Sequence, residues 1–278
     1  KAHANGMKTV VYITSLEVNT IDGETLPNSM FKDHPDWVQR GFNGEPAVFY
    51  GTQEDWVDPG MESAWLSPDS GYRNYFLTRV QQLAGSGVDG IWIDVPIYYG
   101  ITNTSWGGNE PGAATVFKQW SIDKGFSSSG YSTPTGINWD DPKFKAWIQW
   151  RHENLALFME DVRTSIRAIN PDILLIDEVF PVDNMDSTST GLDQSWRINS
   201  DGHLTVWEVD SVSNALGMKW STLEDFTNKI TMYKYARGID RNNPSWAFSY
   251  GNEELDAGLV MGAAVTTGVS PFEAKTPD

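Results

Sequence analysis

Two apolar runs that end on carboxylates constrain the fold of this chain most strongly. The first run covers 87–94 and ends on Asp94; the second covers 172–180 and contains Asp177 and Glu178. A helix-length segment separates them, which is typical of parallel strands joined by a crossover helix. A carboxylate is costly at the end of a buried strand unless chemistry or binding uses it. The sequence therefore predicts a parallel α/β protein with acidic groups at the carboxyl ends of its strands.

Strand and helix patterns alternate along the rest of the chain. Six segments have strand composition, and four have helical spacing between them. The strands are expected at 8–13, 88–94, 172–180, 204–210, 245–250 and 269–272, and the helices at 68–84, 141–169, 222–237 and 255–267. The alternation of strands and helices along the chain favours a (β/α)8 TIM barrel. The six expected strands are two fewer than the eight of such a barrel. We therefore expect an α/β barrel that lacks its first two β/α units in this chain.

The domain prediction is a single catalytic barrel over residues 1–278. Long inserted loops are expected at about 15–68 and 98–135, where no apolar period is sustained, and loops of that length usually carry function or a small subdomain. A doubly wound open sheet is the competing fold. No Gly-x-Gly-x-x-Gly turn follows any of the strands to support a nucleotide site in such a sheet.

Charge and composition narrow the class of partner. The formal net charge is −17 and the sequence pI is about 4.5. Phosphate-backbone binding needs clustered Lys and Arg, so we expect no nucleic-acid partner. The chain has no cysteine, and no apolar run approaches the roughly 18 residues that span a bilayer. The expectation is a secreted or extracellular protein without membrane insertion, whose export signal lies outside the chain; its oligomeric state is left open.

Aromatic residues point to a carbohydrate ligand. The chain has 13 Trp, 10 Tyr and 12 Phe, and several of the Trp residues lie in polar, glycine-bearing segments. Sugar rings have apolar faces that stack on aromatic side chains. The alternative explanation for the many aromatic residues is that a large barrel buries them in its core. The residues predicted to line sugar subsites are Tyr12, Trp65, Trp92, Tyr98 and Trp207.

Several short motifs resemble a known enzyme superfamily. The segments 64–68 (Ala-Trp-Leu-Ser-Pro), 72–73 (Tyr-Arg) and 87–94 resemble the catalytic barrel of retaining glycoside hydrolases, such as the α-L-fucosidase-like and α-amylase-like superfamilies. The resemblance implies that Asp94 closes the fourth strand and acts as the nucleophile. The segment 3–8 looks like the junction of a helix with the third strand of such barrels. Trp92 stands where the amylase pattern has Arg, and no Asn-His-Asp follows the seventh strand, so the amylase substrate class is not carried over.

The second carboxylate of the expected pair is Glu178. The segment 177–180 looks like the amylase-type fifth-strand end, whose Glu is the acid/base, and the apolar residues 173–176 before it favour a protonated carboxyl. Asp177 points to the other side of the strand and is retained as a substrate-binding residue. Two such carboxylates facing one pocket are typical of glycosidic bond cleavage.

Further acidic residues follow the later strands. Glu208 and Asp210 share one face of their strand; Glu208 is a third catalytic candidate, and Asp210 a sugar-hydroxyl acceptor. Asn252 and Glu253 follow the strand at 245–250 and are predicted to bind substrate. An alternative assignment pairs Glu178 with Glu208 or Glu253, possibly with an inverting outcome, because carboxyl separation decides between retention and inversion.

The sequence thus predicts a glycoside hydrolase that cleaves an oligosaccharide or polysaccharide by a two-carboxylate, retaining mechanism without a cofactor. The alternative is a non-catalytic carbohydrate-binding barrel with intact aromatic subsites. A metal-dependent aldolase or amidohydrolase is disfavoured, because no strand-end histidines are paired. The segment 183–186 has oxygen ligands at alternate positions but lacks the glycine and distal Glu of a calcium loop, so no metal site is predicted.

Overall fold

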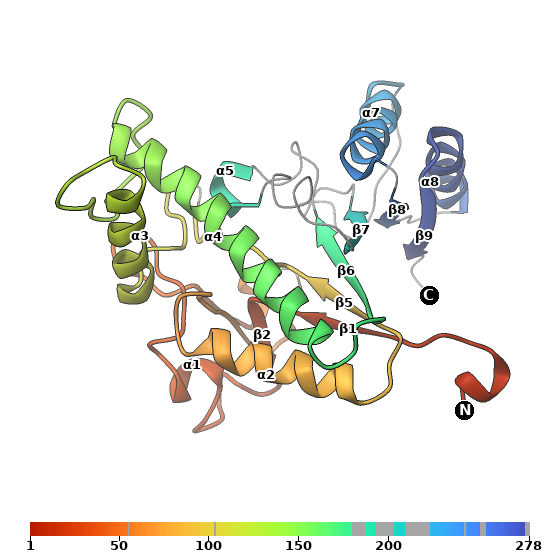
Figure 1. The fold of residues 1–278 in the computed structure, drawn as a ribbon, viewed down its shortest axis with the longest axis horizontal. Helices are drawn as coiled ribbons and strands as arrows, with labels where there is room; N and C mark the ends of the chain where they lie inside the picture. The colour runs from red at the N-terminus through yellow and green to blue at the C-terminus, as the bar shows by residue number, and fades with distance from the viewer. Residues whose placement is uncertain are drawn as a thin grey trace.

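The computed structural model describes residues 1–54, 56–102, 104–179, 187–192, 203–208, 223–241, 243–250 and 254–275. Strands and helices alternate over most of this length, as Figure 1 shows. The strands are β1 (Val10–Thr14), β2 (Glu17–Thr20), β3 (Val48–Tyr50), β4 (Glu62–Trp65), β5 (Gly90–Asp94), β6 (Leu174–Val179), β7 (His203–Glu208), β8 (Ser245–Tyr250) and β9 (Ser270–Lys275). The α-helices are α1 (Met30–Asp33), α2 (Tyr72–Gly85), α3 (Pro111–Asp123), α4 (Pro142–Arg167), α5 (Ser187–Thr190), α7 (Leu223–Asp240) and α8 (Glu254–Thr267), and the 3₁₀ turns are His3–Asn5 and Gly51–Gln53.

The main sheet has six strands in the order β1-β5-β6-β7-β8-β9, and every neighbouring pair is parallel. All six lie where the sequence predicted strands. The four predicted helices are also present as α2, α4, α7 and α8. The prediction of a parallel α/β fold is therefore confirmed.

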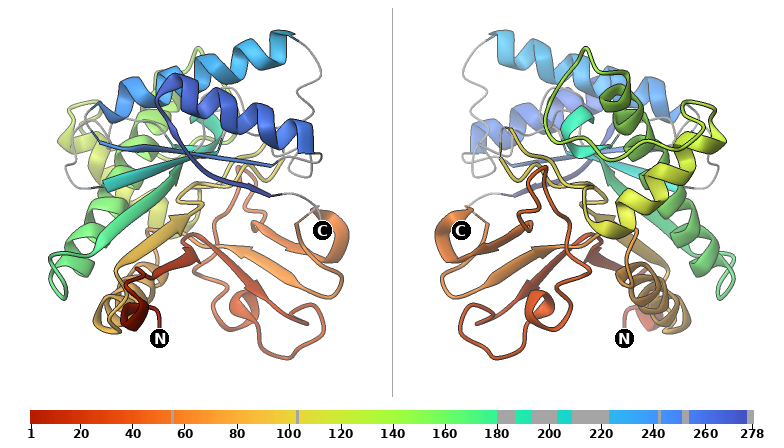
Figure 2. Two further views of the ribbon diagram at one scale, coloured as in Figure 1. Left: turned by 90° about the vertical axis from the view of Figure 1, so that its right-hand side faces the viewer. Right: turned by 90° about the vertical axis from the view of Figure 1, so that its left-hand side faces the viewer.

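The two predicted inserted loops contain regular structure. Between β1 and α2, the strands β2, β4 and β3 form a separate three-stranded antiparallel sheet, which Figure 2 shows beside the main sheet in red to orange. The segment predicted as a loop at 15–68 therefore contains a sheet of its own. The loop predicted at 98–135 is wrong in part, because α3 occupies 13 of its residues. Ala113, Phe117 and Ser121 are spaced four residues apart and form the buried face of α3. This helical spacing was not recognised in the sequence because Gly, Ser and Thr residues are frequent around it.

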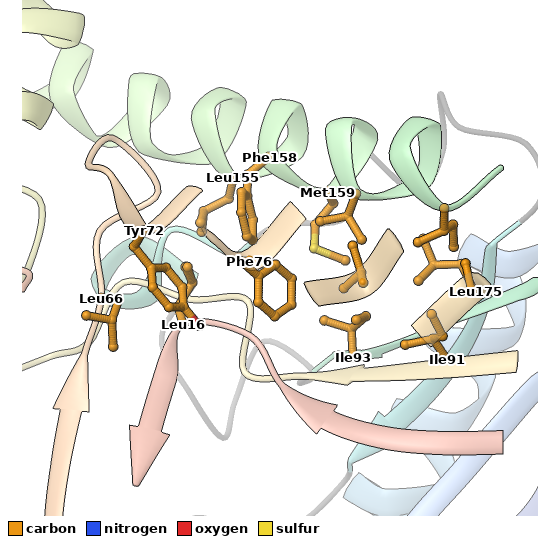
Figure 3. Packing of buried hydrophobic residues seen from close by; sticks show 14 of the residues in the cluster. Leu16, Leu66, Tyr72, Phe76, Ile91, Ile93, Leu155, Phe158, Met159 and Leu175 are labelled. Atoms are coloured by element: carbon orange, nitrogen blue, oxygen red, sulfur yellow. The ribbon is translucent and has the colours of Figure 1, made fainter. Parts of the chain in front are cut away.

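One hydrophobic core lies between the main sheet and the helix pair α2 and α4 (Figure 3). Ile91 and Ile93 of β5 and Leu175 of β6 meet Phe76 of α2 and Phe158 of α4, and all five are buried. Each such side chain contributes roughly 1.5–3 kcal/mol when buried. This layer fixes one face of β5 and β6 against the helices.

Alternate residues of the same strands face the other side. Trp92, Ile176, Val206 and Phe248 come from four neighbouring strands and form a cluster of their own, with Trp246 packed against it. Side chains alternate in direction along a strand, so residues two positions further along β5 and β6 leave this same face. The pattern places Asp94 and Glu178 on it.

The amino end of β5 is anchored to the start of the chain. Asp89 accepts hydrogen bonds from Lys8 Nζ at 2.8 Å and the backbone amide of Thr9 at 2.8 Å, and His3 Nε2 lies 2.7 Å from it. These donors, that of Lys8 foremost, hold the pKa of Asp89 far below its usual range. Asp89 is thus at the opposite end of the strand from Asp94, and its role there is structural.

Candidate active site

The carboxylate of Asp94 is held on two sides at the carboxyl end of β5. Tyr12, on the neighbouring strand β1, donates its hydroxyl to Asp94 Oδ2, and the backbone amide of Val95 lies 2.6 Å from Oδ1. Val95 has φ of 46°, a backbone conformation that β-branched residues rarely adopt. Such strain gathers at functional sites because the surrounding structure has to enforce it.

Glu178 lies on the strand next to Asp94. In the pairing of β5 with β6, Ile93 is opposite Asp177, so Asp94 and Glu178 occupy the next position on each strand. Both side chains leave the face that carries Trp92 and Ile176. Glu178 is 2% exposed, and its strand neighbour on the other side is Val206.

A third carboxylate, which the sequence analysis did not select, belongs to the same region. Glu17 begins β2, three residues after Thr14, and Thr14 pairs with Asp94. The intervening Ser15 donates both its amide, at 2.8 Å, and its hydroxyl, at 2.7 Å, to the carbonyl oxygen of Asp94. The chain between β1 and β2 therefore wraps around the end of β5 and brings Glu17 to it.

Glu17 is buried and bound by two donors from the inserted sheet region. Its Oε1 accepts from Trp56 Nε1 at 2.8 Å and from Ser63 Oγ at 2.7 Å. Burial raises the pKa of Glu17 above its usual value; the bonds from Ser63 and Trp56 oppose the rise, and the negative charge of Asp94 adds to it. The two carboxyl groups are therefore close enough to influence one another electrostatically.

Aromatic rings surround these carboxylates. Tyr12 is 50% exposed and meets the ring of Trp92 edge to face, with 5.0 Å between centroids. Trp65 stacks on Tyr99 at 4.4 Å, and Trp56 meets Tyr99 edge to face at 6.1 Å. Of the predicted subsite residues, the structure thus brings Tyr12 and Trp92 to Asp94, while Trp65 lies buried on the inserted sheet beside Glu17.

Three other predicted substrate-binding residues lie elsewhere. Tyr98 is fully buried: Asn154 donates to its hydroxyl at 2.6 Å, and its ring packs under the guanidinium of Arg151. Trp207 is fully buried and donates from Nε1 to Asp240 at the end of α7, at 2.7 Å. Asp177 is buried on the helix-facing side of β6. The structure does not bring these three to the group around Asp94.

The remaining predicted residues fall outside the described part of the chain. This holds for Asp210, Asn252 and Glu253 as whole residues and for the side chain of Glu208, whose backbone pairs with Phe248 at the end of β7. The oxygen-rich segment 183–186 is also outside it. Within the described ranges, no three His, Asp or Glu side chains are grouped so that they could hold a metal ion, and no helix is long and apolar enough to cross a membrane.

Known proteins resemble this chain in fold. No protein-family model matches it, and no curated protein matches it in sequence. Among solved structures, the catalytic domain of the β-amylase from Paenibacillus polymyxa is similar with a TM-score of 0.59 and 12% identity over 99% of this chain and 76% of that chain. The β-galactosidase from the haloarchaeon Halorubrum lacusprofundi has a TM-score of 0.63 and 12% identity over 97% of this chain and 43% of that chain. The β-galactosidase from Marinomonas ef1 has a TM-score of 0.61 and 13% identity over 98% and 44%, respectively.

The fold is similar to those of these three glycoside hydrolases. The predicted resemblance to this superfamily is confirmed at the level of the fold. The chain spans less than half the length of the two β-galactosidases. Asp94 ends β5 and Glu178 approaches the end of β6, so both lie toward the carboxyl ends of their strands.

Proposed function

We propose that this protein is a glycoside hydrolase that cleaves an oligosaccharide or polysaccharide with Asp94 and Glu178. The observation that carries the proposal is the position of the two carboxylates on one face of adjacent parallel strands. The backbones of neighbouring strands lie about 4.8 Å apart, so the two carboxyl groups can come within about 5 Å of each other, and their separation then depends on the side-chain conformations. Carboxyl groups about 5 Å apart are the arrangement of retaining glycosidases, while inverting enzymes hold them roughly 6.5–9.5 Å apart.

In the proposed reaction, a carboxylate oxygen of Asp94 attacks the anomeric carbon while Glu178 protonates the departing glycosidic oxygen. The bond between Asp94 and the anomeric carbon forms as the glycosidic bond breaks, and a glycosyl-enzyme ester results. Glu178, now ionised, takes a proton from water, and the water oxygen displaces Asp94 from the anomeric carbon. The sugar product then carries the original configuration, and both carboxyl groups return to their starting states.

The groups around Asp94 suit a nucleophile. The Tyr12 hydroxyl and the Val95 amide both donate to its carboxylate, so the ionised form is stabilised and its orientation is fixed. Glu178 lies on the same face and is 2% exposed, and burial favours the protonated form of a carboxyl group. The proposed mechanism needs one ionised and one protonated carboxyl group, and these surroundings support Asp94 as the ionised one.

The test is release of reducing sugar from a panel of polysaccharides by the intact protein, its Asp94→Asn and Glu178→Gln variants, and Asp123→Asn as a control on the exposed end of α3. We expect the parent and the control to hydrolyse one substrate, and both active-site variants to lose about a thousandfold in rate while remaining folded. Sugar binding without hydrolysis by the parent would favour a non-catalytic carbohydrate-binding barrel instead. Activity on a polysaccharide would also fit a secreted or extracellular protein.

A further inference from the structure

The inserted sheet turns one distinct face toward Asp94. Glu17 of β2 is paired with Trp65 of β4, and Ser63 follows two positions away on β4, paired with Asn19 and Phe49. Residues that are opposite each other in an antiparallel pair, or two apart on a strand, share a face of the sheet. The hydrogen bond from Ser63 to Glu17 confirms this orientation. We call this the Glu17 face.

Trp56 lies over the Glu17 face in a fixed orientation. Its Nε1 donates to Glu17 Oε1 at 2.8 Å, and its ring meets Tyr99 edge to face. Trp56 is nevertheless 37% exposed, while Glu17 is only 5% exposed. A partly exposed aromatic ring whose edge is held by a buried acceptor is preorganised for stacking, because little rotamer freedom remains to be lost on binding.

Glu17 connects this ring to the chain that contacts the end of β5. Trp56 is bonded to Glu17, and the charge of Asp94 acts on Glu17. Ser15, two residues before Glu17, is bonded to the Asp94 carbonyl oxygen. The stacking surface is therefore linked through residues 15–17 to the carboxyl end of β5, and we place there a sugar ring adjacent to the cleaved bond.

An independent observation also points to a ligand. The Nε1 of Trp65, on the Glu17 face, is buried and has no hydrogen-bond acceptor among the residues that the structure describes. Buried donors almost always have a partner, and leaving one without costs about 1–3 kcal/mol. A sugar hydroxyl is an acceptor that suits such a donor.

We propose that Trp56 is the stacking platform of a pyranose subsite next to the Asp94 centre, and that Glu17 is the positioning residue that holds its ring. The ligand is an oligosaccharide, with the apolar face of one pyranose ring on the indole. This inference rests on the proposed function for its placement beside the cleaved bond. Its binding part can be measured without hydrolysis.

The experiment uses the Asp94→Asn variant, so that no ligand is consumed, and measures Kd by titration calorimetry with cello-, malto-, galacto- and chito-oligosaccharides. Into this background are placed Trp56→Ala, Trp56→Phe, Glu17→Ala and Glu17→Gln. Trp139→Ala is the matched control, because Trp139 is 50% exposed and packs against Phe144 on the barrel's outer helices. Circular dichroism confirms that each variant is folded.

We expect Trp56→Ala to weaken binding of one oligosaccharide about tenfold or more, and Trp56→Phe to weaken it less, because a smaller ring remains. Glu17→Gln keeps an acceptor for the indole and should bind nearly as the background does, whereas Glu17→Ala should approach the loss seen with Trp56→Ala. Trp139→Ala should change nothing. Unchanged binding in Trp56→Ala, or no binding of any of the four oligosaccharides by the background, overturns the inference.

Hydrolysis by the intact protein separates the two proposals. With Asp94 restored, Trp56→Ala should raise KM about tenfold with a smaller change in kcat, because the platform binds a ring that does not react. A parent without activity on any glycan but with oligosaccharide binding that depends on Trp56 would reject the proposed function and retain the platform. An active parent protein whose KM and Kd are unchanged by Trp56→Ala would support the proposed function and reject the platform.

Discussion

The hydroxyl of Tyr12, on strand β1, donates a hydrogen bond to the carboxylate of Asp94, at the end of the neighbouring strand β5. Both residues were selected from the sequence for different reasons, Tyr12 as a subsite wall and Asp94 as a nucleophile. Their contact gives Tyr12 a second role, because the phenol orients the proposed nucleophile. The ring itself is held against Trp92, so removal of the oxygen alone is a clean perturbation.

Tyr12→Phe should therefore reduce kcat roughly tenfold to a hundredfold, because a donor to the Asp94 carboxylate is lost while the ring stays in place. The measurement is steady-state hydrolysis of the substrate found for the parent protein. Tyr131→Phe is the control and should leave kcat unchanged, because Tyr131 packs against Phe117 of α3 in a separate cluster. Equal kcat in Tyr12→Phe and the parent would show that the hydrogen bond does not serve catalysis.

The positive φ of Val95 predicts an unusual order of stability. Val95→Ala and Val95→Gly both remove the side chain from its packing, but only glycine adopts φ of 46° without steric cost. We expect the Val95→Gly variant to be more stable than Val95→Ala by about 1 kcal/mol in urea-induced unfolding. At an ordinary helix or strand position the glycine variant is the less stable of the two. A Val95→Gly variant less stable than Val95→Ala would therefore contradict the strained backbone.

Glu62 should be essential for the stability of the inserted sheet. It is fully buried and accepts from Ser29 Oγ at 2.6 Å, the amide of Phe31 at 3.0 Å and the hydroxyl of Tyr50 at 3.1 Å. Burial, and the negative charge of Glu62 after it, raise the pKa of Tyr50 to about 12.

Glu62→Ala leaves three donors without this acceptor, so we expect a loss of about 3 kcal/mol or more in the free energy of unfolding. Urea-induced unfolding measures the loss. Glu24→Ala, at an exposed position of the same insertion, should change stability by less than about 0.5 kcal/mol. A similar small effect for Glu62→Ala would mean that the donors find other acceptors.

Asp69 should make stability depend on pH between about 4 and 7. Burial, followed by the negative charge of Glu110, raises its pKa from 3.8 to about 7, against the opposing bond from Asn154 Nδ2 at 2.8 Å. The folded state then binds the proton more tightly than the unfolded state, so the contribution of Asp69 favours folding at low pH. It is lost as the pH rises through this window, with a slope of at most about 1.4 kcal/mol per pH unit.

Asp69→Asn cannot titrate and still offers an oxygen to Asn154. We expect its stability to decline less than that of the parent between pH 4 and 7, as measured by urea-induced unfolding at several pH values. Asp123→Asn, on the exposed end of α3, serves as the comparison and should follow the parent. Parallel curves for Asp69→Asn and the parent would show that Asp69 ionises at the same pH in the folded and unfolded states.

The sequence located most of the main elements because their signals are local. The apolar run at 88–94 and the helical spacing at 141–169 each lie within one element, and period and length identify them without knowledge of the rest of the chain. The inserted sheet was not resolved into strands. β2, β3 and β4 have only three or four residues each, too few for an alternating pattern to stand out.

The candidate site also has features that local sequence predicts and features that only the tertiary structure determines. That Asp94 ends a buried strand is a property of eight consecutive residues, and the sequence by itself determined it. That Asp177 faces the helices while Glu178 shares a face with Trp92 depends on the register between β5 and β6. The residues near Glu17 in the sequence did not indicate a functional role for it, since its hydrogen-bond partners Trp56 and Ser63 are 39 and 46 residues away.

Local order therefore fixed the strands, the crossover helices and the carboxylate at the end of β5, because backbone periodicity and burial act between near neighbours in the chain. Only the tertiary structure decided which side chains meet around that carboxylate. The inserted sheet folds back over the end of β5, and a hydrogen bond between Glu17 and Trp56 depends on where two distant segments lie in space rather than on the composition of either.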